Sequence, residues 1–72
     1  MSIEENENQI IITVAGKDKV GIVASVSNRL AHNKVNIEDI KQTLMQGQFV
    51  MFLLGDISKS TNTFKEIKQA LL

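Results

Sequence analysis

The fold is set by residues 10–21, which read IIITVAGKDKVG from Ile10 to Gly21. The apolar, β-branched run that ends at Ala15 predicts a strand, and a helical spacing of apolar residues begins at Ile22. A strand that turns sharply into a helix leaves backbone N–H groups unpaired at the positive end of the helix dipole. Glycine at both ends of the turn lets the backbone approach a bound group, so this corner suits a carboxylate or a phosphate.

The elements on either side of this corner follow from hydrophobic spacing. The first strand is predicted from about Gln9 to Ala15. The helix after it carries one apolar stripe, made of Ile22, Val23, Val26, Leu30 and Ala31. Asn33 is the predicted left-handed cap at the end of this helix.

Two more strands and one more helix complete the pattern. A strand from Asn36 or Ile37 to Met45 and a strand from Gln48 to Gly55 flank the two-residue hairpin signal Gln46-Gly47. The last helix is predicted over roughly Thr63 to Leu72, with Phe64, Ile67 and Leu71 on one face. Thr63 and Glu66 have the spacing of a capping box, although Thr61 or Asn62 are alternative caps.

The order strand, helix, strand, strand, helix predicts an α+β fold. It is the ferredoxin-like βαββα sandwich, in which an antiparallel sheet carries two helices on one face and the fourth strand is absent. Residues 1–8 are polar and have no periodicity, so they are expected to be a disordered tail. Residues 9–72 are expected to form a single domain.

Self-association is expected for two physical reasons. The first and third strands are apolar on both faces, and two helices cover only one face of a sheet, so the other face should meet a second copy of the chain. Without a fourth strand, the edge from Ile10 to Ala15 would keep unpaired backbone groups. A chain of 72 residues also has only a small core, and without cysteine no disulfide can stabilise it.

Composition excludes several classes of function. Eight basic and eight acidic residues give a net charge of zero, which argues against nucleic acid as a partner. No apolar run approaches the length of a membrane span. The acidic start of the chain does not resemble a signal peptide, so a cytoplasmic location is expected. Without cysteine and with one histidine, neither a metal site nor another cofactor is expected.

Three polar or glycine positions are candidate ligand contacts, each with a structural alternative. Asp18 either bonds a ligand ammonium or caps the first helix through the N–H of residue 20 or 21. Gly21 either leaves room for a ligand or allows close packing of helix and strand. Asn36 carries an amide that donates and accepts together, which suits an amino acid, or it bonds its own backbone in a turn.

The residues from Ile11 to Ala24, followed by Val35-Asn36-Ile37-Glu38-Asp39-Ile40, resemble the amino-terminal half of ACT domains, especially the small free-standing type. The resemblance extends from about Ile10 to Leu72. It implies a βαββαβ fold that pairs into dimers and senses small molecules, most often amino acids, at the subunit interface. The loop positions of the family correspond to Asp18, Lys19, Val20 and Gly21, and the opening of its second strand corresponds to Asn36 and Ile37. The chain departs from the family pattern in one respect: the family has a fourth strand after the second helix, and this sequence ends at Leu72 without one.

We therefore expect a non-enzymatic, homodimeric regulatory module that binds a small molecule, with a protein-protein interaction module without its own ligand as the alternative. An enzyme is disfavoured because no nucleophile has a base with an orienting partner. The spacing of Gly16 and Gly21 matches a phosphate loop, but Ile22-Val23 stands where that motif requires Lys-Ser or Lys-Thr.

Overall fold

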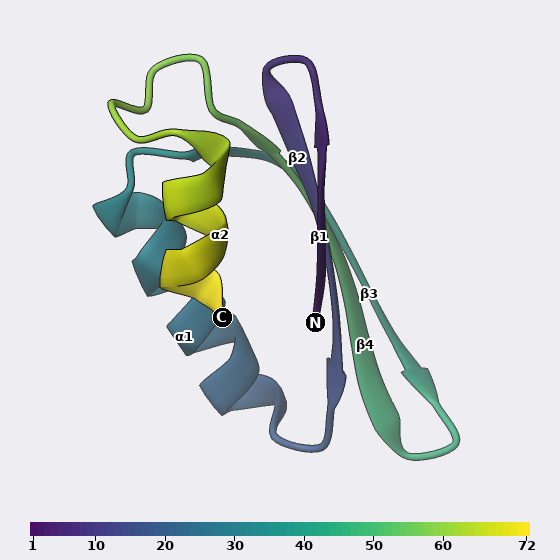
Figure 1. Cartoon of the computed structure of the whole chain (residues 1–72). Helices are drawn as coiled ribbons and strands as arrows, with labels where there is room; N and C mark the ends of the chain where they lie inside the picture. Colours follow the sequence, from purple (N-terminus) through teal and green to yellow (C-terminus); the bar gives the residue numbers. More distant parts are fainter.

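The sheet has four antiparallel strands and carries both helices on one of its faces. The computed structural model describes all residues, Met1–Leu72. In chain order the elements are β1 (Ser2–Asn6), β2 (Gln9–Gly16), α1 (Lys19–His32), β3 (Asn36–Met45), β4 (Gln48–Asp56) and α2 (Phe64–Leu71). The strand order is β1-β2-β4-β3, and Figure 1 shows the sheet edge-on with both helices on its left. The predicted ferredoxin-like sandwich is confirmed.

The prediction that residues 1–8 form a disordered tail is wrong. Residues 2–6 form β1, which pairs antiparallel with β2 from Ser2↔Thr13 to Asn6↔Gln9. Ile3 is the one buried side chain of this strand. Polar composition misled the prediction because an edge strand needs only backbone pairing and one inward apolar residue to be held.

β1 also changes which sheet edges are free. No strand follows α2, and β1 instead fills the fourth position, beside β2. The edge from Ile10 to Ala15, expected to be unpaired, is therefore covered by β1 as far as Thr13. The outer edges of β1 and β3 are the ones that end the sheet.

The hairpin between β3 and β4 is confirmed. Met45 pairs with Gln48, and the two turn residues have positive φ angles of 50° at Gln46 and 81° at Gly47. Two positive φ angles are what a type I′ turn requires, and its twist matches that of the flanking strands.

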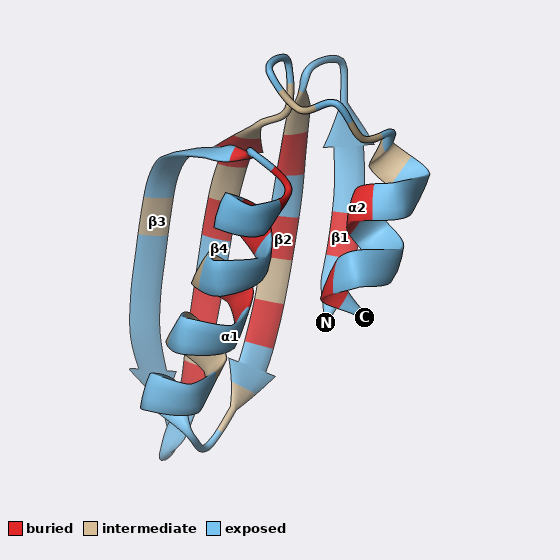
Figure 2. Cartoon of the chain, turned by 90° about the vertical axis from the view of Figure 1, so that its left-hand side faces the viewer, coloured by how far each residue is buried: buried red, intermediate tan, exposed pale blue.

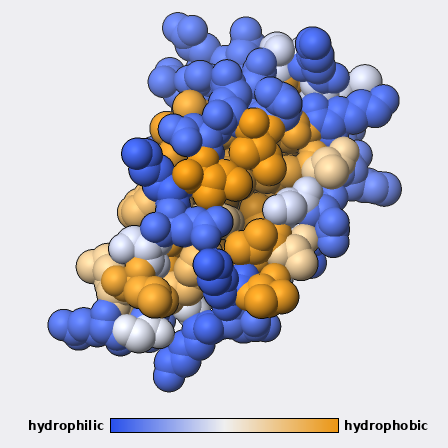
Figure 3. All heavy atoms as spheres, turned by 180° about the vertical axis from the view of Figure 1, so that it is seen from behind, coloured by the Kyte–Doolittle hydropathy of each residue, from blue (hydrophilic) through white to orange (hydrophobic).

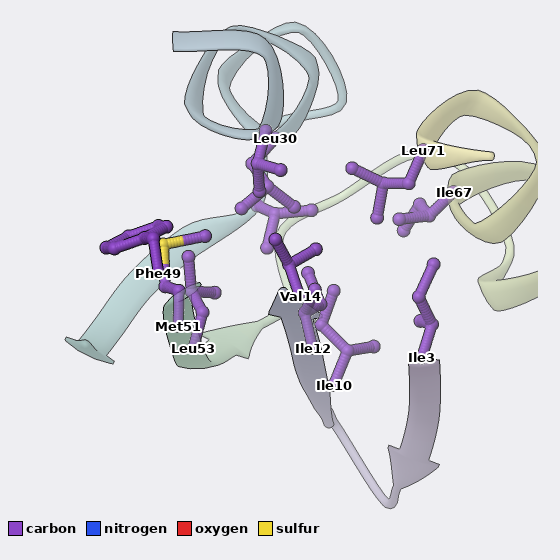
Figure 4. Close-up of a cluster of buried hydrophobic side chains, with 12 residues drawn as sticks. Ile3, Ile10, Ile12, Val14, Leu30, Phe49, Met51, Leu53, Ile67 and Leu71 are labelled. Carbon is purple, nitrogen blue, oxygen red and sulfur yellow. The ribbon is translucent and has the colours of Figure 1, made fainter. Parts of the chain in front are cut away.

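The core lies between the sheet and the helices. Alternate residues of β2 and β4 face the helices, so these two central strands carry alternating buried and exposed positions (Figure 2). Ile3 of β1 points toward Ile67 and Leu71 of α2 (Figure 4). Val26 and Leu30 of α1 are buried, whereas Ala31, predicted on the same stripe, is exposed. The buried apolar residues are Ile3, Ile10, Ile12, Val14, Val26, Leu30, Val35, Phe49, Met51, Leu53, Ile67 and Leu71.

The ends of the helices explain several polar residues. The capping box at α2 is confirmed: Glu66 N–H donates to the Thr63 hydroxyl, and Thr63 N–H donates to the Glu66 carboxylate at 2.9 Å. At the end of α1 the left-handed residue is Lys34, with φ 58°, and the prediction of Asn33 at that position is wrong because its φ is −94°.

Asn33 instead joins α1 to the segment before α2. Its side-chain amide donates to the Arg29 carbonyl at 2.8 Å, and its own carbonyl accepts from the Ser60 hydroxyl at 2.7 Å. The side-chain amide of Asn62 donates to the side-chain oxygen of Asn33. These bonds satisfy the polar atoms of Asn33, which is 9% exposed.

The face of the sheet away from the helices is uncovered. Cross-strand pairing puts Ile11, Thr13 and Ala15 of β2 on this face opposite Leu54, Phe52 and Val50 of β4. Ile11 is 39% exposed and Phe52 47%. We call these six residues the open face. Figure 3 looks at the molecule from the side of the β3 edge, where hydrophobic residues lie in the middle of the surface and hydrophilic ones around them. Neither helix is long and apolar enough to cross a membrane.

Candidate functional site

The candidate site is built around the corner between β2 and α1. The Asp18 carboxylate accepts from Gly21 N–H at 3.0 Å, and the Asp18 carbonyl accepts from Ile22 N–H at 3.0 Å. The capping interpretation of Asp18 is thus confirmed. The N–H groups of Lys19 and Val20 have no partner within the chain. They remain available to an anionic group at the positive end of α1.

Gly21 is glycine because of the cap above it. A Cβ on Gly21 would lie against the Asp18 carboxylate, with the carboxylate carbon at 2.9 Å. The nearest neighbour of such a Cβ is thus the capping carboxylate, and both interpretations of Gly21, room for a ligand and close packing of helix and strand, stay predictions. The spacing of three residues between Asp18 and Gly21 is that of a helix cap and the N–H from which it accepts, as one of the two predicted roles of Asp18 requires.

Lys19 and Val20, the first two residues of α1, have side chains that lie away from the Asp18 cap. The Lys19 ammonium lies 5.8 Å from the centre of the Phe49 ring, within range of a cation–π interaction. Val20 is 79% exposed. A hollow of about 330 Å³ lies beside Lys19, and its other walls come from β3 and β4, including Leu44 and Phe49.

Asn36 and Ile37 lie at the other end of the sheet. Asn36 pairs with Asp56, which pairs with Gln9 at the start of β2. The corner follows Gly16, which pairs with Phe49 and so lies level with Leu44 of β3. The stretch from Asn36 to Leu44 spans about 26 Å at the ordinary rise of a strand. A single chain therefore does not bring Asn36 and Ile37 together with Asp18, Lys19, Val20 and Gly21.

A second hollow, of about 430 Å³, lies on the other side of the first turn of α1. We call it the corner hollow. Asp18, Gly21 and Ser25 form its polar part. Its apolar part is Met1, Val14, Ala15, Ile22 and Val26. Two of the six predicted ligand contacts, Asp18 and Gly21, line it, and the β1 residues that sequence analysis assigned to a tail hold Met1 beside it.

A third hollow, of about 350 Å³, is wholly polar and lies at the Asn36 end of the sheet. It brings together Glu7, Glu38 and Asp56, and the Gln9 amide donates to Glu38 at 3.3 Å. The backbone N–H of Ser58, which donates to Asp56 at 2.8 Å, holds the pKa of that carboxyl below its ordinary value; the Ser58 side chain and the charge of Lys59 add to this effect. No three histidine or acidic side chains are placed to hold a metal ion.

The chain resembles known proteins over almost its whole length. The sequence model of the family described as "ACT domain" matches residues 8–72. A UPF0237 protein of Clostridium acetobutylicum is 56% identical over 61 residues, which are 85% of this chain and 68% of the relative. A UPF0237 protein of Methanococcus maripaludis is 52% identical over 62 residues, covering 86% and 69%. A solved structure, an ACT domain protein from Streptococcus pneumoniae, superposes with a TM-score of 0.72 at 41% identity, covering 89% of this chain and 72% of that one.

Proposed function

This chain belongs to the ACT domain family, and we propose that it is a non-enzymatic regulatory module that binds a small molecule, an amino acid, as a homodimer. ACT domains typically bind small ligands for regulation and commonly dimerise. The observation that carries the proposal is the corner, where two free N–H groups at a helix start lie beside a carboxylate. These groups suit an ammonium and a carboxylate carried by one molecule.

The homodimer is proposed because, within one chain, the predicted contacts lie at opposite ends of the sheet. Asn36 and Ile37 can reach the corner only if they come from a second copy. The outer edge of β3 has no partner, and nine of its ten residues are exposed. If two copies pair antiparallel along this edge, the Asn36 end of one β3 lies beside the Leu44 end of the other. Asn36 and Ile37 of one copy then approach Lys19 and Val20 of its partner.

Charge favours one register of this pairing. Asp39 and Lys41 lie on the same face of β3, two residues apart, with Ile40 between them. With the two-fold axis at Ile40, each Asp39 lies opposite the Lys41 of the other copy. Opposite charges that face each other across strands are favourable, and like charges are not.

The first experiment tests binding. The full chain is screened by thermal shift and calorimetry against the twenty common amino acids. We expect at least one to stabilise the fold by RT ln(1 + [L]/Kd), about 2.7 kcal/mol at a hundredfold excess over Kd. No response from a folded dimer would overturn the proposal.

The second experiment tests whether two chains share the site. Val20→Trp blocks the corner, and Asn36→Ala removes the amide at the far end of β3. Each variant alone should lose binding. Mixed after unfolding and refolding together, they should recover about a quarter of the sites, because a mixed dimer keeps one intact site. If mixing restores nothing, a shared site is excluded.

The open face favours a second candidate function. Ile11 and Phe52 are exposed apolar residues on a sheet face without cover, which is a feature of protein interaction surfaces. A protein-protein interaction module without its own ligand would bind one stoichiometric partner and tolerate Val20→Trp. Loss of amino-acid binding in Val20→Trp, with the fold retained, decides against it.

A further inference from the structure

Charged residues lie on both sides of the open face. Because paired residues of neighbouring strands point to the same side of a sheet, the pairing places Glu4 of β1 beside Ile11 of the open face. Asp39 of β3 lies beside Leu54 in the same way, and Ile11 pairs with Leu54. One row across the sheet therefore has two apolar residues in the middle and an exposed carboxylate at each end.

Negative charge prevails on this side of the sheet. Phe52, which is 47% exposed, pairs with Lys41 of β3 in the next row. Lys41 is the only basic residue that the strands place on this side, against three acidic residues, Glu4, Asp39 and Asp56. This side therefore carries an excess of negative charge, although the whole chain has a net charge of zero.

The width and length of this surface fit one α-helix. Glu4 and Asp39 are three strand spacings apart, which is about 14 Å, and an α-helix with its side chains is about 10–12 Å wide. β4 runs between these two carboxylates, has nine residues and is about 27 Å long. A helix of about 18 residues has the same length. Such a helix, laid along β4, would cover the exposed parts of Ile11, Phe52 and Leu54.

Charge decides which kind of partner fits. A second copy brings the same excess of negative charge to the contact, and like charges directly opposite each other are unfavourable. A helix with acidic residues beside its apolar stripe has the same fault. A helix with Lys or Arg on both sides of the stripe instead pairs with Glu4 on one flank and with Asp39 on the other. The long aliphatic part of a basic side chain can also lie on the apolar surface while its charge reaches the edge.

We propose that the open face docks an amphipathic helix of a partner protein, one whose apolar stripe lies on Ile11, Phe52 and Leu54 and is flanked by basic residues that pair with Glu4 and Asp39. Exposed apolar surface with a polar rim is typical of protein interaction sites, and an amphipathic helix is a common form of the partner segment. The surface is separate from the corner between β2 and α1, so this inference goes beyond the proposed function and does not depend on the identity of a small ligand. Pairing of two copies along β3 leaves the open face uncovered.

The probe is a synthetic peptide of about 18 residues that is built from leucine and lysine, with leucine on one helical face and lysine on both sides of it. The comparison peptide has glutamate in place of every lysine. Fluorescence anisotropy of the labelled peptides measures their binding to the full chain. We expect the leucine–lysine peptide to bind at least tenfold more tightly, and to lose affinity as the salt concentration rises. Equal binding of the two peptides would overturn the inference.

Two substitutions in β1 test the charge. Glu4→Gln and Glu5→Gln remove the same charge from neighbouring exposed residues, but Glu5 pairs with the core residue Ile10 and so points to the other side of the sheet. Glu4→Gln should weaken binding of the leucine–lysine peptide at least threefold, and Glu5→Gln should leave its affinity unchanged. Equal effects of the two substitutions would show that the peptide responds to net charge alone, against the inference.

Two further substitutions test the apolar contact. Phe52→Ser removes the largest side chain of the open face, and Leu44→Ser removes an exposed apolar side chain on the other side of the sheet, where Leu44 pairs with Phe49. With the fold verified by circular dichroism, Phe52→Ser should weaken binding of the peptide at least tenfold and Leu44→Ser should not. Undiminished binding to the Phe52→Ser variant would place the peptide elsewhere and contradict the inference.

A second copy on the open face is a separate outcome. If Phe52→Ser lowers the oligomeric state of the peptide-free chain in sedimentation velocity, then another copy covers this face and the inference is wrong. The proposed function fails on a different observation, the absence of any amino-acid response from the folded dimer, which involves none of these peptides.

Discussion

At the scale of single residues, the end of α1 has a lysine at a position where glycine is the usual residue. Lys34 adopts φ 58°, and hydrogen bonds from Val35 N–H to the Leu30 carbonyl and from Lys34 N–H to the Ala31 carbonyl close the helix around it. This is the Schellman arrangement, in which glycine is preferred because a side chain in the left-handed region meets steric resistance. The fold therefore stores strain at a surface lysine.

Lys34→Gly should raise the free energy of unfolding by about 0.5–1 kcal/mol, because glycine relieves that strain. Urea unfolding measures the change. Lys65→Gly, an exposed lysine in α2, is the control and should lower stability by about 1 kcal/mol. If both variants were less stable than the unmodified chain, the left-handed conformation of Lys34 would carry no strain energy and the prediction would be wrong.

Gly21→Ala places two effects of similar size against each other. Alanine favours the helix by about 1 kcal/mol over glycine, but its Cβ displaces the Asp18 carboxylate and weakens a cap that contributes about 1 kcal/mol. The net change in unfolding free energy should stay within about 0.5 kcal/mol. In an Asp18→Ala background, the same Gly21→Ala change should stabilise by about 1 kcal/mol. A double-mutant cycle without coupling would show that the two residues act independently.

At the scale of elements, the position of β1 depends on a few contacts. Five residues pair with β2, and Ile3, 8% exposed, joins them to α2. Met1, next to this strand, lines the corner hollow. A short polar strand therefore both closes a sheet edge and contributes a wall of the candidate site.

Ile3→Ala should lower the free energy of unfolding by about 2–3 kcal/mol, since it removes a buried side chain from the contact with Ile67 and Leu71. Glu4→Ala, the neighbouring exposed position, should change it by less than about 0.5 kcal/mol. Chemical denaturation measures both. If both substitutions changed the free energy of unfolding by equally negligible amounts, residues 1–8 would be a disordered tail, as their composition predicts.

The capping box of α2 should make stability depend on pH. The Thr63 backbone N–H and hydroxyl hold the pKa of Glu66 below its ordinary value of 4.5. A carboxyl whose pKa is lower in the folded state stabilises the fold above its unfolded pKa, and this stabilisation is lost as pH falls through the folded pKa. Glu66→Gln keeps a capping side chain but should flatten the fall in stability below pH 4.5. Melting temperatures across this range, with the unmodified chain alongside, measure the difference, and parallel curves would contradict the assignment.

At the scale of the whole molecule, the two layers leave one sheet face and the β3 edge without cover. Both helices pack on the same face (Figure 1), so the open face keeps its apolar residues exposed. The candidate contacts are also separated by the length of the sheet. A second copy paired along β3 would bring them together, and further copies could cover the open face.

Lys41→Asp should weaken the proposed homodimer at least tenfold, because the introduced carboxylate of one copy would face Asp39 of the other at both symmetric positions. The charge swap that combines Asp39→Lys with Lys41→Asp should restore association, because opposite charges face each other again. Sedimentation velocity measures the dissociation, and Lys17→Asp, in the loop before α1, is the control for the change in net charge. A failure of the swap to restore the dimer would exclude the register centred on Ile40.

Much of the fold could be predicted because its signals are local. Apolar runs mark β2 and β4, the turn residues Gln46-Gly47 mark the hairpin that joins β3 to β4, and Thr63 with Glu66 marks the start of α2. The cap at Asp18 is one of its two predicted roles for the same reason, since capping depends on residues two or three apart.

The remaining features depend on contacts between residues that are distant in sequence. The sequence by itself determined the strand–helix order, the two-sided apolar strands and the corner that follows β2, because side-chain periodicity and turn preferences act over a few residues. Only the tertiary structure decided that a polar amino-terminal segment becomes β1, that Met1 reaches the corner hollow, and that Asn36 lies far from Gly21. These outcomes depend on which sheet edge is free and which way each strand runs, and both are properties of the assembled sheet.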